Sequence, residues 1–278
     1  MDIIVAKDVR KKFRLKHGQE VNNNGIVSNE IEALGGFDLQ IRKGEFLVLV
    51  GLSGSGKSVF LDLVGGLSAP TSGVVYLDDK PVEAPSDKTG YVFQQYALFP
   101  WRTALSNIEF GLESRGVVKD ERVKIARELL SLFGLSDFED RYPYQLSGGM
   151  QQRVAIARAL ATKPEVLLMD EPFAALDAQT REILQNELIR IWEGTDTTVI
   201  FVTHSIDEAV FLADRVAVVT ARPGKIKEII EIDLPRPRNG DVRSSSEFAA
   251  NRLKVWGALK SEVNKAQQDW KLASAFTD

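Results

Sequence analysis

The sequence predicts an α/β fold built on a parallel β-sheet, and three observations support this prediction. Four short aliphatic runs contain no polar interruption: FLVLV at 46–50, VLLM at 166–169, VIFVT at 199–203 and VAVVT at 216–220. Runs of this kind are typical of strands that helices cover on both faces. Helical patterns follow the second and third runs, at residues 180–192 and 205–213. Strand, helix and strand at this spacing indicate crossover connections between parallel strands.

The first 50 residues predict three strands, at 3–13, 31–41 and 45–50, with a turn at Lys43 and Gly44 before the last. Alternation of Phe37, Leu39 and Ile41 with polar residues indicates a half-buried antiparallel strand. The polar stretch between residues 14 and 29 contains the hairpin signal Asn24-Gly25, so we expect a surface loop or ribbon there.

Two further regions differ in pattern from the predicted sheet. Residues from about 101 to 160 have helical composition and no strand-like apolar run, so we expect an inserted helical subdomain. From Leu234 the chain becomes rich in Pro, Arg and Ser, and a helical pattern resumes at 247–263. We therefore expect a main domain over residues 1–235 and a linker with a C-terminal helical appendage over 236–278.

Composition excludes several function classes. The 278 residues include 35 Lys and Arg against 39 Asp and Glu, a net charge of −4 that argues against nucleic-acid binding through bulk electrostatics. Cysteine is absent, which excludes disulfides, a cysteine nucleophile and a thiolate zinc site. Only two histidines are present, so a histidine-rich metal centre is not expected. No apolar run approaches the ~20 residues of a membrane-spanning helix, and the first residues do not resemble a secretory signal.

Residues 51–58 (GLSGSGKS) have the spacing of a phosphate-binding loop, between the strand at 46–50 and an apolar helical segment. Glycines let the backbone curl so that successive N–H groups point at an anion near the positive end of a helix dipole. We expect Lys57 to contact the β- and γ-phosphates and the Ser58 hydroxyl to ligate Mg²⁺. A glycine-rich turn with an incidental lysine is the alternative, and the strand-to-helix context disfavours it. The residues expected at the nucleotide are Gly51, Ser53, Gly54, Ser55, Gly56, Lys57, Ser58 and Val59.

The apolar run 166–169 ends in two acidic residues, Asp170 and Glu171. In parallel sheets the carboxyl ends of the strands line the ligand crevice. Asp170 would then hold Mg²⁺ through water, and Glu171 would face the γ-phosphate and polarise the attacking water. Such a run is common by itself, so this prediction depends on its pairing with the phosphate loop.

Residues 147–153 (SGGMQQR) precede the helical run 154–160 and form a second candidate anion site. Ser147 suits a helix N-cap, and Gly148 and Gly149 offer free backbone N–H groups. A plain helix cap is the alternative, but a cap requires neither two glycines nor the polar run that follows.

The order of these motifs resembles the ATP-binding cassette of ABC transporters over roughly residues 3–235. The most specific match is LSGGMQQR at 146–153, because other phosphate-loop enzymes lack it. The resemblance implies a P-loop ABC ATPase core with an antiparallel β subdomain, an inserted helical subdomain, and ATP and Mg²⁺ as cofactors. The other matching residues are GLSGSGKS, Gln94, LLMDEP at 167–172, Ala175-Leu176-Asp177 and His204.

The resemblance also implies roles for single residues. Gln94 would be the Q-loop glutamine that contacts Mg²⁺ and senses the membrane partner, Asp177 the D-loop aspartate, and His204 the switch histidine at the γ-phosphate. Phe13 matches the aromatic residue that stacks on adenine, although a buried strand aromatic is the alternative. The expected catalytic residues are Glu171, His204 and Gln94; the expected metal ligands are Ser58, Gln94 and Asp170; and Phe13, Ser147, Gly148, Gly149 and Asp177 join the phosphate loop at the nucleotide.

Among ABC importers, the chain is similar to the nitrate, sulfonate, taurine and bicarbonate group. The matching stretches are FPWRTA at 99–104, ARPGKI at 221–226 and DLPRP at 233–237. These stretches do not identify the solute, because the cassette does not contact the cargo. Two departures stand out: Val59 occupies a position where many cassettes have Thr, and Met150 replaces a commoner Gln.

We therefore expect an ATPase subunit that powers solute import, peripheral at the cytoplasmic face of the membrane. Its expected partners are a second cassette with ATP at the interface, transmembrane permease subunits and, indirectly, a periplasmic or extracellular solute-binding protein, but no nucleic acid. The alternative is a soluble ABC ATPase acting in translation, DNA repair or chromosome organisation. One copy of each motif argues against the two-cassette translation type, and the segment between 57 and 147 is too short for the coiled coils of the repair type.

Four large apolar or aromatic residues follow the Q-loop glutamine: Tyr96, Leu98, Phe99 and Trp101. Clustered side chains of this kind suggest a partner surface, which the resemblance assigns to a cytoplasmic helix of the permease. The alternative is that they pack internally against the helical subdomain.

Overall fold

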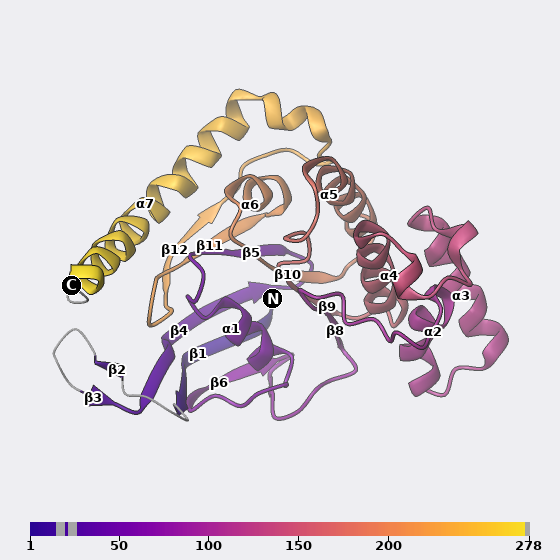
Figure 1. Ribbon diagram of the computed structural model, residues 1–278, viewed down its shortest axis with the longest axis horizontal. Coiled ribbons are helices and arrows are strands. Elements are labelled where there is room, and N and C mark those ends of the chain that lie inside the picture. The colour runs from indigo at the N-terminus through magenta and orange to yellow at the C-terminus, as the bar shows by residue number, and fades with distance from the viewer. Residues whose placement is uncertain (15–19, 22–26, 276–278) are drawn as a thin grey trace.

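The computed structural model describes residues 1–14, 20–21 and 27–275, and a six-stranded sheet lies at its centre (Figure 1). The five strands from β11 to β8 are mutually parallel, and β12 pairs antiparallel at the edge. Every residue of β5, β10 and β11 is buried. The predicted parallel sheet is thus confirmed, since all four apolar runs are strands within it. In spatial order the strands are β12 (Ile226–Glu231), β11 (Arg215–Val219), β5 (Phe46–Val50), β10 (Thr198–Thr203), β9 (Val166–Asp170) and β8 (Thr89–Val92).

A second, antiparallel sheet is formed mainly by the N-terminal part of the chain. Its order is β4 (Glu30–Arg42), β1 (Asp2–Arg14), β6 (Ser72–Leu77) and β7 (Lys80–Pro81). Phe37, Leu39 and Ile41 are buried while the residues between them are exposed, as the alternation predicts. The short strands β2 (Glu20–Val21) and β3 (Val27–Ser28) pair antiparallel, and the predicted Asn-Gly turn between them lies outside the described residues.

Two hydrophobic clusters cover the two faces of the parallel sheet. Alternate residues of a strand point to opposite faces, and β5 shows this directly. Phe46, Val48 and Val50 belong to one cluster, and Leu47 and Leu49 belong to the other. Because both faces are covered, polar chemistry is confined to the ends of the strands.

Helices α1, α5 and α6 follow β5, β9 and β10 along the chain, so each begins near the carboxyl end of its strand. Their bounds are Lys57–Val64, Ala178–Trp192 and Ile206–Leu212. This arrangement places helix N-termini and strand C-termini at one edge of the sheet, where ligands bind in folds of this type.

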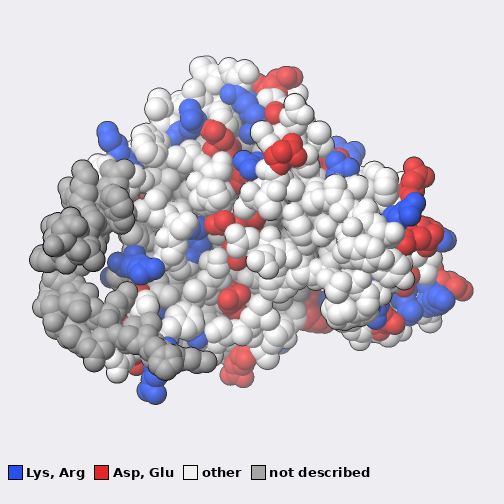
Figure 2. Space-filling model, in the orientation of Figure 1, with Lys and Arg blue, Asp and Glu red and all other residues white. Residues whose placement is uncertain are grey.

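Three helices project from one side of the sheet, at the right of Figure 1. They are α2 (Ala104–Ser114), α3 (Lys119–Leu132) and α4 (Gly148–Ala161), with the short 3₁₀ turns η1 (Ser136–Phe138) and η2 (Pro143–Gln145) between α3 and α4. Figure 2 shows basic and acidic side chains intermingled over this region. Several of them are paired, as Arg102 is with Glu113 and Arg127 with Glu139.

The chain ends in the 3₁₀ turn η3 (Gly240–Ser244) and the long helix α7 (Ser246–Ala275). Phe248, Val255 and Leu259 of α7 are buried in the larger hydrophobic cluster. Within the described residues, no helix combines the length and the apolar character needed to cross a membrane.

Candidate nucleotide site

The phosphate loop connects the end of β5 to the start of α1, and its glycines are required by the geometry. Gly56 has φ +85°, and a Cβ there would lie 2.7 Å from the Ala33 carbonyl oxygen and 2.7 Å from Leu34 Cδ2. Gly54 has φ +77°. An L side chain at either position would be strained, and at Gly56 it would also overlap β4. The GxxxxGK spacing thus produces a tightly supported turn at the start of α1, where backbone N–H groups favour an anion.

Lys57 is buried, with 4% of its surface exposed. Its Nζ donates hydrogen bonds to the carbonyl oxygens of Gly51 at 2.9 Å and Leu52 at 3.0 Å, within the phosphate loop. Burial lowers the pKa of Lys57, and the nearby Glu171 and Asp170 carboxylates oppose that shift. The only full positive charge in the phosphate loop is therefore held inside it, next to two acidic residues.

Ser58 and Asp170 lie side by side at the mouth of the loop. The Ser58 hydroxyl donates to Asp170 Oδ1 at 2.8 Å, which joins the first turn of α1 to the carboxyl end of β9. Burial raises the pKa of Asp170, and the hydrogen bond from Ser58 opposes that shift. A hydroxyl and a carboxylate are oxygen ligands of the kind that Mg²⁺ prefers, and Mg²⁺ commonly uses one or two such groups together with phosphates and water. The residues present therefore fit this ion.

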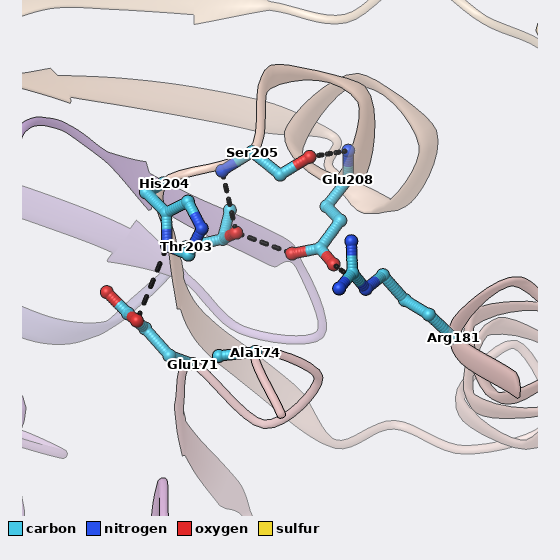
Figure 3. Close-up of a pocket in the computed structure, with 7 residues that line it drawn as sticks. All are labelled: Glu171, Ala174, Arg181, Thr203, His204, Ser205 and Glu208. Carbon is cyan, nitrogen blue, oxygen red and sulfur yellow. Dashed lines mark hydrogen bonds and ion pairs between the residues drawn. The ribbon is translucent and has the colours of Figure 1, made fainter. Parts of the chain in front are cut away.

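The three expected catalytic residues meet at one point. His204 Nδ1 lies 3.4 Å from Glu171 Oε2, as Figure 3 shows, and Gln94 Nε2 lies 3.5 Å from the same oxygen. Glu171 adopts φ +43°, a left-handed conformation that is uncommon for a residue with a side chain. Strain of this kind is found at active sites, where the surrounding structure enforces it. The structure thus brings together residues from the ends of β9 and β10 and from the segment after β8.

His204 belongs to the short loop between β10 and α6, and it is the exposed member of that loop. Its side chain is 59% exposed, whereas neighbouring Thr203 is buried at 2%. Ser205 caps α6, its hydroxyl accepting the backbone N–H of Glu208 at 3.3 Å. Burial raises the pKa of Glu208, and the hydrogen bond from Thr203 opposes that shift. Glu208 and Arg181 line the same pocket as Glu171 and His204 (Figure 3).

The signature loop, defined as Ser147, Gly148 and Gly149, lies at the N-terminus of α4. Ser147 is the N-cap of that helix and accepts the Met150 backbone N–H at 3.3 Å, as predicted. A Cβ on Gly148 would lie 3.0 Å from Tyr96 Oη, and one on Gly149 would lie 2.6 Å from Thr180 Cγ2. Within the part of the chain that the structure describes, no hydrogen bond or ion pair joins the signature loop to the phosphate loop.

The remaining predicted nucleotide residues have different surroundings. Phe13 is 45% exposed beside the Lys11 ammonium, so the alternative of a buried strand aromatic is wrong. Asp177 caps α5 and accepts the Thr180 backbone N–H at 3.0 Å, a hydrogen bond that holds the pKa of this carboxyl below its usual range. Val59 packs against the hydrophobic cluster that contains Leu47 and Leu49.

The four apolar residues after Gln94 divide into packed and exposed members. Leu98 packs against the larger hydrophobic cluster, which contains Phe46, and the centre of the Phe99 ring lies 4.5 Å from that of Phe110. Trp101 is 72% exposed, with its ring 5.6 Å from Phe99. Internal packing thus accounts for part of this group, and Trp101 is left on the surface.

Sequence reasoning missed the support beneath the phosphate loop. Gly224 lies so close that a Cβ on it would be 2.1 Å from the Ser55 carbonyl oxygen, and its N–H donates to Ala33 at 2.9 Å. The Arg222 guanidinium lies 3.5 Å from the place where a Gly54 side chain would begin. The Pro223-Gly224 pair was the only local signal, and it did not reveal which part of the chain the turn supports.

The chain is similar to known proteins of one family. The family model described as ABC transporter matches residues 34–174. An uncharacterized ABC transporter ATP-binding protein of Methanocaldococcus jannaschii is 54% identical over 93% of this chain and 97% of its own length. The nitrate import ATP-binding protein NrtD of Synechocystis sp. is 49% identical over 74% of this chain and 77% of that protein. The bicarbonate transport ATP-binding protein CmpC of Synechococcus elongatus is 48% identical over 86% of this chain, which matches 35% of that longer protein.

A solved structure is also similar. It is a dimeric, post-hydrolysis state of an ATP-binding cassette bound to ADP and Pi, which this chain matches with a TM-score of 0.71 and 38% identity. The match covers 84% of this chain and 100% of the other.

Proposed function

This chain belongs to the ABC transporter family as an ATP-hydrolysing transporter subunit, and from that premise we propose that it powers import of a small solute of the nitrate, sulfonate, taurine and bicarbonate type. The observation that carries the ATPase part is the meeting of Glu171, Gln94 and His204 beside the phosphate loop. The names of the nitrate and bicarbonate relatives support the importer group.

In the proposed site, Lys57 and the backbone N–H groups of the phosphate loop hold the β- and γ-phosphates. Ser58, Asp170 and Gln94 hold Mg²⁺, which neutralises phosphate charge when bound. Glu171 polarises the attacking water and accepts its proton, while His204 donates a hydrogen bond to the γ-phosphate. Phe13 stacks on the adenine, and its exposure supports this role because a buried ring could not do so.

The active unit contains two cassettes, each contributing one loop to each ATP. The signature loop is mostly exposed to solvent, and no hydrogen bond or ion pair among the described residues joins it to the phosphate loop of the same chain. A two-fold pair arranged head to tail places the signature loop of one chain over the γ-phosphate held by Lys57 of the other. The dimeric state of the structurally similar cassette supports this arrangement. Asp177 caps α5 and accepts the backbone N–H of Thr180, and Thr180 is the residue that packs against Gly149. Asp177 therefore lies close to the signature loop of its own chain.

The membrane partner is a permease, contacted through the surface around Gln94 to Trp101 at the cytoplasmic face of the membrane. Trp101 is exposed, and Arg158 ties the backbone near it by donating to the Tyr96 carbonyl oxygen at 3.0 Å. A hydrogen-bonded backbone near an exposed tryptophan suits a docking site, since Trp is frequent among residues that dominate interface energies. A solute-binding protein delivers the cargo to the far side of the permease.

The direct test reconstitutes the chain with its permease and solute-binding protein in vesicles. We expect ATPase activity to rise when nitrate, bicarbonate, taurine or an alkyl sulfonate is added, and uptake of that solute to depend on ATP. Activity indifferent to all four would overturn the importer group.

The docking surface is tested separately by cysteine crosslinking, which is clean because the chain has no cysteine of its own. Trp101→Cys should crosslink to the permease, and Leu253→Cys, similarly exposed on α7, serves as the matched control. Equal labelling from both positions would count against the proposed surface.

A further inference from the structure

The loop that carries His204 is held by a buried carboxylate. The Thr203 hydroxyl donates to Glu208 Oε2, and Thr203 Oγ1 accepts the Ser205 backbone N–H at 3.0 Å. Thr203 and Glu208 are 2% and 6% exposed. The residues on both sides of His204 are thus hydrogen-bonded to each other and to Glu208, and Figure 3 shows this network beside the imidazole.

The second carboxylate oxygen of Glu208, Oε1, contacts residues of α5. Gln185 Nε2 donates to Glu208 Oε1 at 3.0 Å, and Arg181 Nε lies 3.7 Å from the same oxygen. Gln185 is 3% exposed, so its amide depends mainly on partners within the protein. A buried amide that lost its partner would be left with unsatisfied hydrogen-bonding groups, which is unfavourable.

Gln185 is in turn held by the segment that follows the ATPase domain. Arg243 Nη2, in η3, donates to Gln185 Oε1 at 2.5 Å. The guanidinium lies 3.8 Å from the centre of the Phe211 ring on α6, which fixes its orientation. An unbroken chain of hydrogen bonds therefore runs from Arg243 through Gln185 and Glu208 to Thr203, next to His204.

We infer that Arg243, Gln185 and Glu208 are positioning residues, through which the segment after Pro235 sets the orientation of His204 for hydrolysis. This inference rests on the proposed role of His204 at the γ-phosphate. It assigns a function to the C-terminal appendage, because Arg243 links that appendage through hydrogen bonds to the loop that carries His204. Displacing η3 would remove the hydrogen bond from Arg243 to Gln185. Gln185 would then hold Glu208 less firmly, and Glu208 would hold the loop that carries His204 less firmly.

The test compares Arg243→Met with wild type in the full-length protein. Methionine keeps an unbranched side chain over Phe211 but removes the donor to Gln185. We expect kcat for ATP hydrolysis to fall about 3- to 10-fold, as loss of one hydrogen bond predicts, with KM for ATP unchanged. Arg243→Lys should recover part of kcat, because its ammonium can donate to Gln185.

The NMR signal of His204 distinguishes a change in the position of its ring from a loss of stability of the whole protein. The chain has two histidines, so a His17→Asn background leaves His204 as the only imidazole signal. Its ring resonances should shift in Arg243→Met and return toward wild type in Arg243→Lys. Gln185→Met, which breaks the chain at its middle, should shift them in the same way.

Arg252→Met is the matched control. Arg252 on α7 pairs with Asp207 on α6 at 2.8 Å, so it also joins the C-terminal segment to the ATPase domain, but at an exposed position outside the hydrogen-bond chain from Arg243 to Thr203. It should leave both kcat and the His204 signal unchanged. Equal kcat and equal His204 resonances in Arg243→Met and Arg252→Met would overturn the inference. His204→Ala separates this failure from failure of the proposed function: if it retains full kcat, the assigned role of His204 is wrong.

Discussion

The phosphate loop and the signature loop both lie at helix N-termini, yet they differ in how much of an active site each one completes. The phosphate loop is closely supported by its own chain, with β4 on one side, Gly224 beneath it, and Lys57 buried near two carboxylates. The signature loop is mostly exposed, and its serine is occupied in capping α4. This difference fits the proposal that the phosphate loop binds the nucleotide with residues of its own chain, whereas the signature loop acts on the nucleotide held by a second chain.

The largest expected effect concerns the chemistry beside the phosphate loop. Glu171→Gln should still bind Mg-ATP but should lose about 10²- to 10⁴-fold in single-turnover hydrolysis, because an amide cannot accept the proton of the attacking water. Glu165→Gln is the control, since Glu165 immediately precedes β9 at its opposite end and pairs with Lys43 and Lys88. Near-normal turnover by Glu171→Gln would show that another group takes the proton.

The close support of the phosphate loop is tested by the stability of the protein without nucleotide. Gly56→Ala should lower the free energy of unfolding by roughly 2–5 kcal/mol, because it adds left-handed strain to overlap with Ala33 and Leu34. Gly116→Ala is the matched control: Gly116 has φ +74° with nothing within 4 Å of its Cβ position, so about 1–2 kcal/mol of strain alone is expected there. Equal losses in denaturant unfolding would mean that the loop is not tightly supported.

The Lys57→Ala variant tests whether the phosphate loop is the site that binds ATP. Lys57→Ala leaves the phosphates with backbone donors, and a hydrogen bond to a charged group is worth about 1.5–3 kcal/mol. ATP affinity should therefore fall about 10- to 150-fold in equilibrium binding. An unchanged ATP affinity in the folded variant would contradict the assignment of this loop as the phosphate-binding site.

The smallest effect, and the most specific for the half-site, is complementation. Lys57→Ala and Ser147→Arg chains should each fail to dimerise with ATP, but a mixed dimer carries both lesions in one composite site and leaves the other intact. An equal mixture should recover up to about half of the wild-type sites, because only mixed dimers form and each has one intact site of two. Nucleotide-dependent dimerisation measured by light scattering gives the result, and a mixture as inactive as either variant would contradict the arrangement in trans.

Local patterns were sufficient for the motif residues and for part of the strands, but they did not predict β6, β7, β8 or β12. Uninterrupted aliphatic runs predicted β5, β9, β10 and β11 because burial on both faces leaves no position for a polar residue. The N-cap role of Ser147 was likewise predicted, since capping involves residues only three positions apart.

The sequence by itself therefore determined the fold class, the phosphate loop and the identity of the residues that gather around it. Only the tertiary structure decided what supports them: Gly224 beneath Ser55, Tyr96 against Gly148, and the relay from Arg243 to Thr203. The physical reason is that these contacts depend on the spatial order of the strands, β11, β5, β10, β9 and β8, which differs from their order along the chain. A residue's own neighbours in sequence carry no record of which distant segment that order places against it.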